Sequence, residues 1–143
     1  MRCLGLDIGD RRIGVAMSDP VGILATPHSI IERTADDIAA IVKLLEQYQI
    51  KKIIVGFPIK LDGNVGDQAI KVQGFIEHLT AHTGIPIELR DERMSSVSAR
   101  RLMQQGRTKK VKQKVHDDAA AAAVILQSYL DESAPDLPDL IQD

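Results

Sequence analysis

The sequence predicts an α/β fold in which a mixed β-sheet is flanked by helices. Three short apolar stretches separated by turn residues open the chain, and this pattern predicts an antiparallel meander of strands. The segments that follow alternate between helical and strand periodicity, which is typical of parallel strands connected by helices. At 143 residues, with 44% hydrophobic but only 3% aromatic residues, the chain is expected to build one core of Ile, Leu, Val and Ala.

The first three strands are expected at residues 3–8, 13–17 and 22–25. Residues 9–12 form a link short enough for a hairpin, and Ser18-Asp19-Pro20 is a second turn signal. Two later apolar runs, at residues 53–56 and 87–90, predict further strands. The first of these is rich in β-branched residues, as buried parallel strands are.

Helical spacing of apolar residues marks most of the remaining chain. Thr34 and Asp37 resemble a capping box at the start of one helix, and a helix that opens at Asp117-Asp118 is expected to run to about Tyr129. Residues 106–113 are too polar to pack and predict a basic loop. The other helices are expected from about residue 67 and over residues 95–105.

One domain is expected over residues 1–132, followed by an acidic, loose tail at residues 133–143. No apolar run approaches the roughly 20 residues of a membrane span, and the N-terminus lacks the pattern of an export signal. The single cysteine, Cys3, cannot form an internal disulfide and is expected in the core. These features predict a cytoplasmic protein without a membrane partner.

The net charge of −2 hides a strong asymmetry along the chain. Residues 93–116 contain eight Lys or Arg residues and no acid, whereas the rest has ten basic and twenty acidic side chains. A stretch of one sign suits a polyanionic ligand such as nucleic acid. The alternative is a flexible basic loop that only keeps the protein soluble.

Three separated acids could together bind a metal ion. Asp7 lies at the end of an apolar strand between Gly5 and Gly9, which would leave space around its carboxylate. Glu92 follows a strand, and Asp118 opens a helix. Singly, each has a simpler explanation: a turn, an exposed loop or a helix cap. Together they supply the hard oxygen ligands that Mg²⁺ prefers.

The histidines do not match a known metal-binding motif. His78 and His82 are four residues apart but are not part of a His-Glu-x-x-His sequence, so a surface position is expected for both.

Four blocks of the sequence resemble the YqgF/RuvX family, and they occur in the family's order. They are Asp7 to Asp19, Val55-Gly56-Phe57-Pro58 with Asp62-Gly63, Asp91 to Ser95, and Asp118 to Gln127. The family is known as ribonuclease-H-like. Its members are described as Holliday junction resolvases and as nucleases that mature the 5′ end of 16S ribosomal RNA.

The resemblance implies a metal-dependent nuclease in which Asp7, Glu92 and Asp118 are the catalytic acids and the metal ligands. The Asp117-Asp118 doublet allows a slip of one residue, so Asp117 remains an alternative. The implied cofactor is Mg²⁺, or Mn²⁺, with two ions that activate water and stabilise the leaving oxygen. The cationic residues expected to bind backbone phosphates are Arg11, Arg12, Arg93, Arg100, Arg107, Lys109, Lys110 and Lys112.

Two other classes of function remain open on the sequence. A relative of the actin-like ATPases would also place an Asp-x-Gly near its first strand, but that architecture needs two such domains. A non-catalytic RNA-binding assembly factor would use only the basic stretch. The sequence leaves open whether the nucleic acid is precursor ribosomal RNA or branched DNA, and whether the protein is a monomer or a homodimer.

Overall fold

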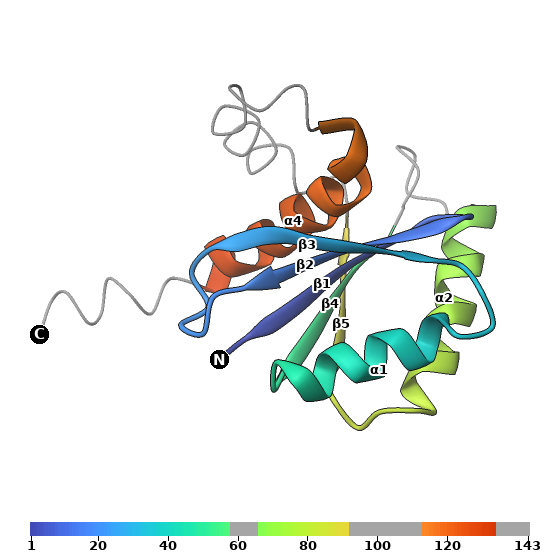
Figure 1. Ribbon diagram of the computed structural model, residues 1–143, viewed down its shortest axis with the longest axis horizontal. Coiled ribbons are helices and arrows are strands. Elements are labelled where there is room, and N and C mark those ends of the chain that lie inside the picture. The colour runs from blue at the N-terminus through green and yellow to red at the C-terminus, as the bar shows by residue number, and fades with distance from the viewer. Residues whose placement is uncertain (58–65, 92–112, 134–143) are drawn as a thin grey trace, which may run out of the picture.

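The computed structural model describes residues 1–57, 66–91 and 113–133, which form a five-stranded mixed sheet with helices on both faces (Figure 1). The predicted fold class is therefore confirmed. The elements, in chain order, are β1 (Cys3–Ile8), β2 (Arg12–Ser18), β3 (Ala25–Glu32), α1 (Asp37–Gln47), β4 (Lys52–Phe57), α2 (Asp67–Thr80), β5 (Ile87–Asp91) and α4 (Gln113–Ser133).

The strand order in the sheet is β3-β2-β1-β4-β5. The first three strands form the predicted antiparallel meander, with β1 paired to β2 and β2 paired to β3. On its other side β1 pairs in parallel with β4, and β4 pairs in parallel with β5. The carboxyl ends of β1, β4 and β5 therefore meet at one edge of the sheet.

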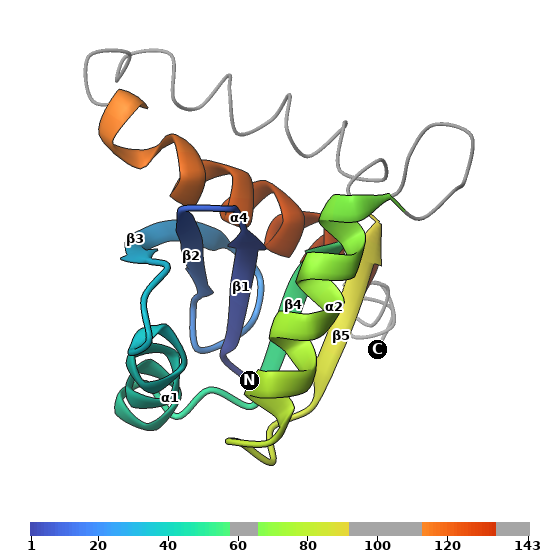
Figure 2. The same ribbon diagram turned by 90° about the vertical axis from the view of Figure 1, so that its right-hand side faces the viewer.

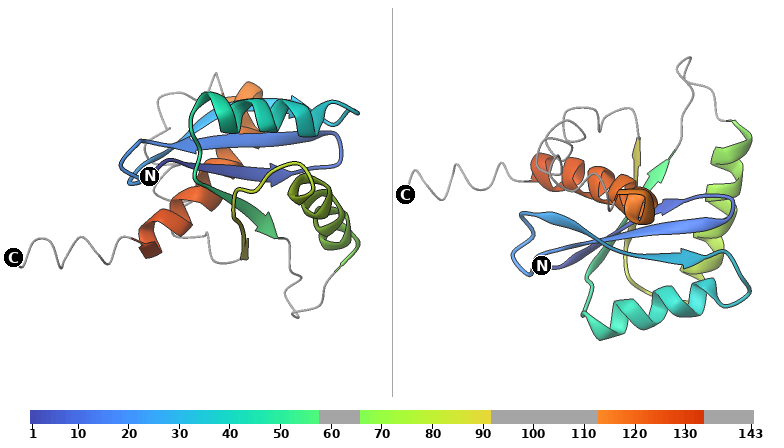
Figure 3. Two further views of the ribbon diagram at one scale, coloured as in Figure 1. Left: turned by 90° about the horizontal axis from the view of Figure 1, so that it is seen from below. Right: turned by 45° about the horizontal axis from the view of Figure 1, so that its top comes forward.

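The two faces of the sheet carry separate cores. Alternate residues of β1, Leu4, Leu6 and Ile8, pack with residues of α1 and α2 on one face. Cys3 faces the other way and packs with α4, and its burial raises the pKa of its thiol, as suits a core residue. Figures 2 and 3 show α1 and α2 on the face opposite α4.

The expected third strand at residues 22–25 is wrong, because β3 begins only at Ala25, the last residue of that range. Oδ1 of Asp19 accepts hydrogen bonds from the backbone N–H groups of residues 22, 23 and 24, which ties this segment into a loop. Desolvation opposes the charged carboxylate, but these N–H groups outweigh it and lower the pKa of Asp19. The side chains of Ile23 and Leu24 consequently remain 49% and 46% exposed.

Two of the predicted helix starts need correction, whereas the helix expected from about residue 67 does begin at Asp67. Thr34 and Asp37 form no capping box: α1 has no side-chain cap, and Oδ1 of Asp37 instead accepts from the N–H of Ile38 at 2.7 Å. Helix α4 begins at Gln113, so Asp117 and Asp118 lie in its second turn and do not open it. The helix starts earlier because residues 113–116 contain no breaker.

Helix α4 approaches β1 closely at Gly5. A Cβ atom built at Gly5 would lie 2.8 Å from Cβ of Leu126 and 3.0 Å from the carbonyl oxygen of Ala122. The expectation that Gly5 leaves space beside Asp7 is therefore wrong: the space is filled by the helix.

The carboxyl-terminal half of α4 is also tied to β4 and β5 by polar contacts. The ammonium of Lys52 lies 2.8 Å from Glu88 and 4.9 Å from the centre of the Tyr129 ring, and the carboxylate of Glu88 raises the pKa of Lys52. The guanidinium of Arg90 donates to the hydroxyl of Ser128 and pairs with Glu132. These contacts fix the position of the helix along the strands.

Gly5→Ala is expected to lower the free energy of unfolding by about 1–3 kcal/mol, because a methyl group forced into this contact must displace α4 or strain β1. Urea denaturation followed by circular dichroism measures the change. Gly74→Ala is the matched control, since no heavy atom lies within 4 Å of a Cβ at Gly74 on the exposed side of α2. That variant should gain about 0.5–1 kcal/mol. Equal stabilities for the two variants would contradict the close contact.

Candidate active site at the carboxyl ends of the parallel strands

Asp7 lies one residue before the end of β1, on the face covered by α4. Its side chain is half-buried and shares this face with Cys3 and Gly5. The adjacent residues across the sheet are both glycines. Asp7 pairs with Gly14 on β2, and because Leu6 pairs with Val55, the next residue of β4 beside Asp7 is Gly56. The two residues paired directly with Asp7 therefore add no side chain of their own.

Gly14 and Gly56 were not predicted as neighbours of Asp7. They reach it only through strand pairing, whereas Gly5 and Gly9 are near it along the chain. The β1–β2 hairpin signal was sufficient to find Gly14, because a four-residue link fixes the register.

The turn that follows Asp7 is built tightly. The N–H of Gly9 donates to the carbonyl oxygen of Arg12 at 2.9 Å. A Cβ atom at Gly9 would lie 2.8 Å from that same oxygen, so the turn excludes any side chain there. Gly9 therefore serves the hairpin and not a ligand.

Three side chains from outside the hairpin hold the segment after Asp7. Nε2 of Gln68 donates to the carbonyl oxygen of Ile8 at 3.1 Å, and Nη1 of Arg33 donates to that of Gly9 at 2.8 Å. Nζ of Lys71 lies 3.4 Å from Asp10, in an exposed pair. Residues 8–10 are thus anchored to α2 and to the segment before α1, and this fixes the strand end that carries Asp7.

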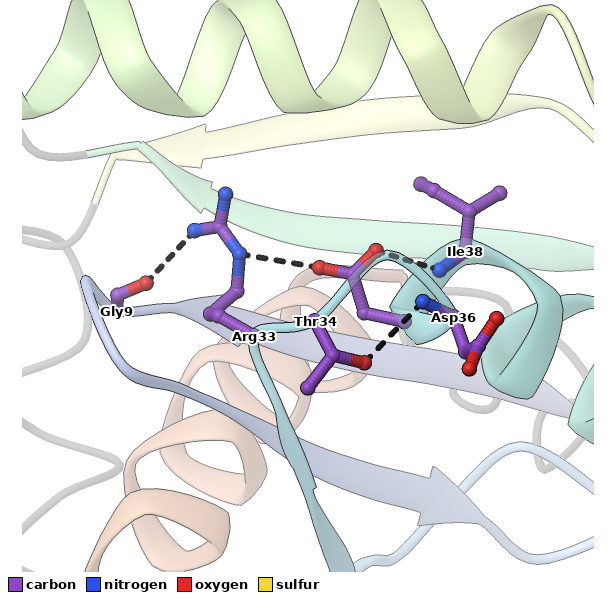
Figure 4. Close-up of polar contacts among 6 residues, drawn as sticks. Gly9, Arg33, Thr34, Asp36 and Ile38 are labelled. Carbon is purple, nitrogen blue, oxygen red and sulfur yellow. Dashed lines mark hydrogen bonds and ion pairs between the residues drawn. The ribbon is translucent and has the colours of Figure 1, made fainter.

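Arg33 is the central residue of this anchor (Figure 4). Besides Gly9, it contacts the buried carboxylate of Asp37, with Nε 3.2 Å from Oδ2, and its guanidinium carbon lies 5.0 Å from the centre of the Phe75 ring. Asp37 in turn accepts from the N–H of Ile38, which begins the buried side of α1. Arg33 therefore links the hairpin, α1 and α2.

The other predicted site residues divide into two groups. Arg11 and Arg12 are exposed beside the β1–β2 turn, at the same end of the sheet as Asp7. Asp117 and Asp118 lie within α4, where the structure describes the helix but not their side chains. The remaining predicted residues lie outside the described ranges: Glu92, Arg93, Arg100, Arg107, Lys109, Lys110 and Lys112.

Within the described ranges, no three His, Cys, Asp or Glu side chains are grouped so that they could hold a metal ion. Two of the three predicted ligands, Glu92 and the Asp118 side chain, fall outside that search. None of the described helices is long and apolar enough to cross a membrane.

A family model described as "RuvX: Holliday junction resolvase" matches residues 1–132. The chain belongs to this family. A protein from Desulforamulus reducens named "Putative pre-16S rRNA nuclease" is 41% identical over 136 residues, which cover 94% of this chain and 99% of that protein. A protein of the same name from Clostridium novyi is 42% identical over 133 residues, which cover 92% of this chain and 98% of that protein. The expected enzyme class, a hydrolase of phosphodiester bonds, is confirmed for the family.

Solved structures agree on the fold. RuvC from T. thermophilus, in complex with a Holliday junction substrate, superimposes with a TM-score of 0.60 at 11% identity and covers 94% of this chain and 97% of its own. The Holliday junction resolvase of fowlpox virus has a TM-score of 0.56 at 16% identity, with coverage of 93% and 99%. The ribonuclease-H-like fold implied by the sequence resemblance is thereby confirmed.

Arg33→Gln is expected to lower the free energy of unfolding by about 2 kcal/mol, because charge-assisted hydrogen bonds are lost and Asp37 stays buried without its cation. Urea denaturation measures this loss, and amide hydrogen exchange should show faster exchange in the β1–β2 turn. Lys71→Gln, which removes only an exposed ion pair, is the control and should change stability little. Equal stabilities and equal amide exchange rates in the two variants would refute the role of Arg33 as an anchor of the turn.

Proposed function

We propose that this chain is a divalent-metal-dependent nuclease that processes the 5′ end of precursor 16S ribosomal RNA. The observation that carries the proposal is the setting of Asp7: a half-buried carboxylate between two glycines, on a strand end held from outside, in a chain of a nuclease family. The names of the two relatives above supply the substrate.

Asp7, Glu92 and Asp118 are the proposed metal ligands. Glu92 follows directly on Asp91, the last residue of β5, and β5 ends at the same edge of the sheet as β1. Ligand sites gather at such edges in α/β sheets. The three carboxylates suit Mg²⁺ or Mn²⁺, one or two ions, which when bound would supply Lewis-acid stabilisation and an activated water.

Helix geometry favours Asp118 over Asp117 as the third ligand. Asp118 occupies the position four residues before Ala122, whose carbonyl lies against Gly5, and eight before the buried Leu126. Asp117 lies four residues before the half-buried Ala121 and eight before the buried Ile125, but the atoms nearest to Gly5 belong to Ala122 and Leu126. Residues four apart share a side of a helix, so the position of Asp118 belongs to the side turned toward β1.

The protein chain has separate tasks around this centre. Asp7 is proposed to bind the metal through its carboxylate oxygens. Their position is restrained because Arg33 and Gln68 hold the end of the strand that carries Asp7. Arg11 and Arg12, exposed at the same end, and the basic residues of 93–112 are proposed to bind backbone phosphates. Such contacts give affinity without sequence readout, which suits processing guided by RNA shape. A cytoplasmic location, as monomer or homodimer, accords with this role.

Cleavage of Holliday junctions is the second candidate, because the family model carries that description. A resolvase must cut two strands symmetrically and would require a homodimer. The two functions use the same metal chemistry and differ in substrate, so only direct comparison of the substrates separates them.

Asp7→Asn is expected to reduce Mg²⁺-dependent cleavage of precursor 16S RNA by at least about 10²-fold, since several kcal/mol of metal-derived transition-state stabilisation are lost. Wild-type protein should cut the RNA faster than a synthetic four-way DNA junction under the same conditions.

The matched control is Asp10→Asn, which makes the same chemical change three residues away in the exposed turn and should retain activity. Equal melting temperatures exclude unfolding as the cause of a loss. Full cleavage by the Asp7 variant would reject the metal site, as expected for a non-catalytic RNA-binding factor. Faster cleavage of the DNA junction than of the RNA would identify branched DNA, and not precursor 16S RNA, as the substrate.

Asp118→Asn and Asp117→Asn form a second matched pair. The first is expected to lose cleavage by about 10²-fold for the same reason as Asp7→Asn, whereas the second should remain active. The measurement is the cleavage rate as a function of Mg²⁺ concentration. The opposite ranking would assign the ligand to Asp117.

A further inference from the structure

Two exposed histidines lie four residues apart at the carboxyl end of α2, away from the candidate active site. His78 is in the last turn of the helix, and the N–H of His82 donates to Leu79 in the turn that follows. Their rings are stacked, with centroids 5.3 Å apart and planes inclined by 19°. The expected surface position of both residues is confirmed.

The hydrogen bonding of His82 fixes which ring nitrogen is available. Its Nδ1 lies 2.9 Å from the carbonyl oxygen of His78. Because a carbonyl oxygen can only accept, Nδ1 carries the hydrogen, and the neutral ring keeps a free lone pair on Nε2. Metal-binding histidines are oriented in this way, with the second nitrogen donating to a backbone carbonyl.

The separation of the two rings also suits a shared ion. Imidazole nitrogens bind Zn²⁺ at about 2.0–2.1 Å, which brings the centroids of two rings on one ion to roughly 5 Å. Both rings must turn about their side-chain bonds to aim at a common point, and because both residues are exposed, packing does not prevent this.

The surroundings leave the remaining coordination positions open. The two histidines border a shallow cleft of about 390 Å³, whose other wall is formed by α1 residues including Lys43 and Glu46. No third His, Cys, Asp or Glu of the described chain completes a cluster with them. Among the described residues, the other positions are thus left to water or a small external ligand.

We propose that His78 and His82 form a two-histidine site for a borderline divalent transition-metal ion, represented by Zn²⁺. Imidazole favours Zn²⁺, Ni²⁺ and Cu²⁺, whereas the carboxylates proposed for catalysis favour Mg²⁺. The site is separate from the catalytic one in both position and chemistry, and it does not depend on nuclease activity.

The test is calorimetric titration of tag-free, full-length protein with Zn²⁺. Excess Mg²⁺ is present throughout, so that sites made of oxygen ligands are already occupied. Wild-type protein should bind one ion at this site. His78→Gln and His82→Gln should each weaken that binding by on the order of 10²-fold, since a bidentate site becomes monodentate. Ni²⁺ should selectively broaden the amide resonances of residues 76–83 in wild-type protein.

His28→Gln is the matched control, because both ring nitrogens of His28 are engaged, with the hydroxyls of Ser29 and Tyr48. It should bind Zn²⁺ as wild type does. Absence of Zn²⁺ binding in wild type, or binding unchanged in both test variants, would overturn the site. Zn²⁺ binding that disappears in Asp7→Asn instead would assign the ion to the carboxylates.

Discussion

The close contact of α4 with β1 at Gly5 is the constraint on which the arrangement of the candidate site depends. The helix lies so near the strand that a single methyl group would overlap Leu126. Contacts of Lys52 and Arg90 with the end of α4 fix its position along the strands. Because a helix is rigid over a few turns, fixing α4 at Ala122 and beyond also sets where its second turn, with Asp118, can lie.

The hairpin after Asp7 is fixed from the opposite face of the sheet. Arg33 and Gln68 bind backbone carbonyls there, not side chains, so they restrain the path of the chain itself. The carboxylate of Asp7 points toward α4 while its backbone is held from the side of α1 and α2. The two layers of the fold thus restrain one residue together, which is what a metal ligand requires.

Most of the fold could be predicted from local patterns. Periodicity correctly placed four strands, β1, β2, β4 and β5, and the central residues of helices α1 and α2. The errors have local as well as distant causes, and the loop at residues 22–25 has both, because Asp19 accepts hydrogen bonds from three of its backbone N–H groups. Ile23 and Leu24 look like a strand, but Gln127, more than a hundred positions away, binds the carbonyl of Ile23 and stabilises a loop. The true third strand is a polar edge strand, in which Pro27 and exposed residues hide the pattern.

The same distinction applies to the site. Asp7 was predictable because an acid inside an apolar strand is conspicuous, but its glycine neighbours Gly14 and Gly56 depend on register. Arg33 was not predictable as an anchor, because its partners lie on three separate elements. Sequence periodicity shows which side chains of a helix or strand form its buried face. It carries little information on polar contacts between elements, since these depend on topology.

The position of Asp7 in the topology explains why an acid is tolerated there. β1 is central in the sheet, antiparallel to β2 and parallel to β4, so its carboxyl end lies between two covered strands and not at an exposed edge. Such a position is rigid but partly removed from water, where an ionised carboxylate is costly unless a cation or hydrogen bonds stabilise it. The flanking glycines Gly14 and Gly56 add no apolar side chains that would raise this cost. An acid on a central strand is held rigidly, and the cation proposed to bind there would offset the electrostatic penalty of its charge.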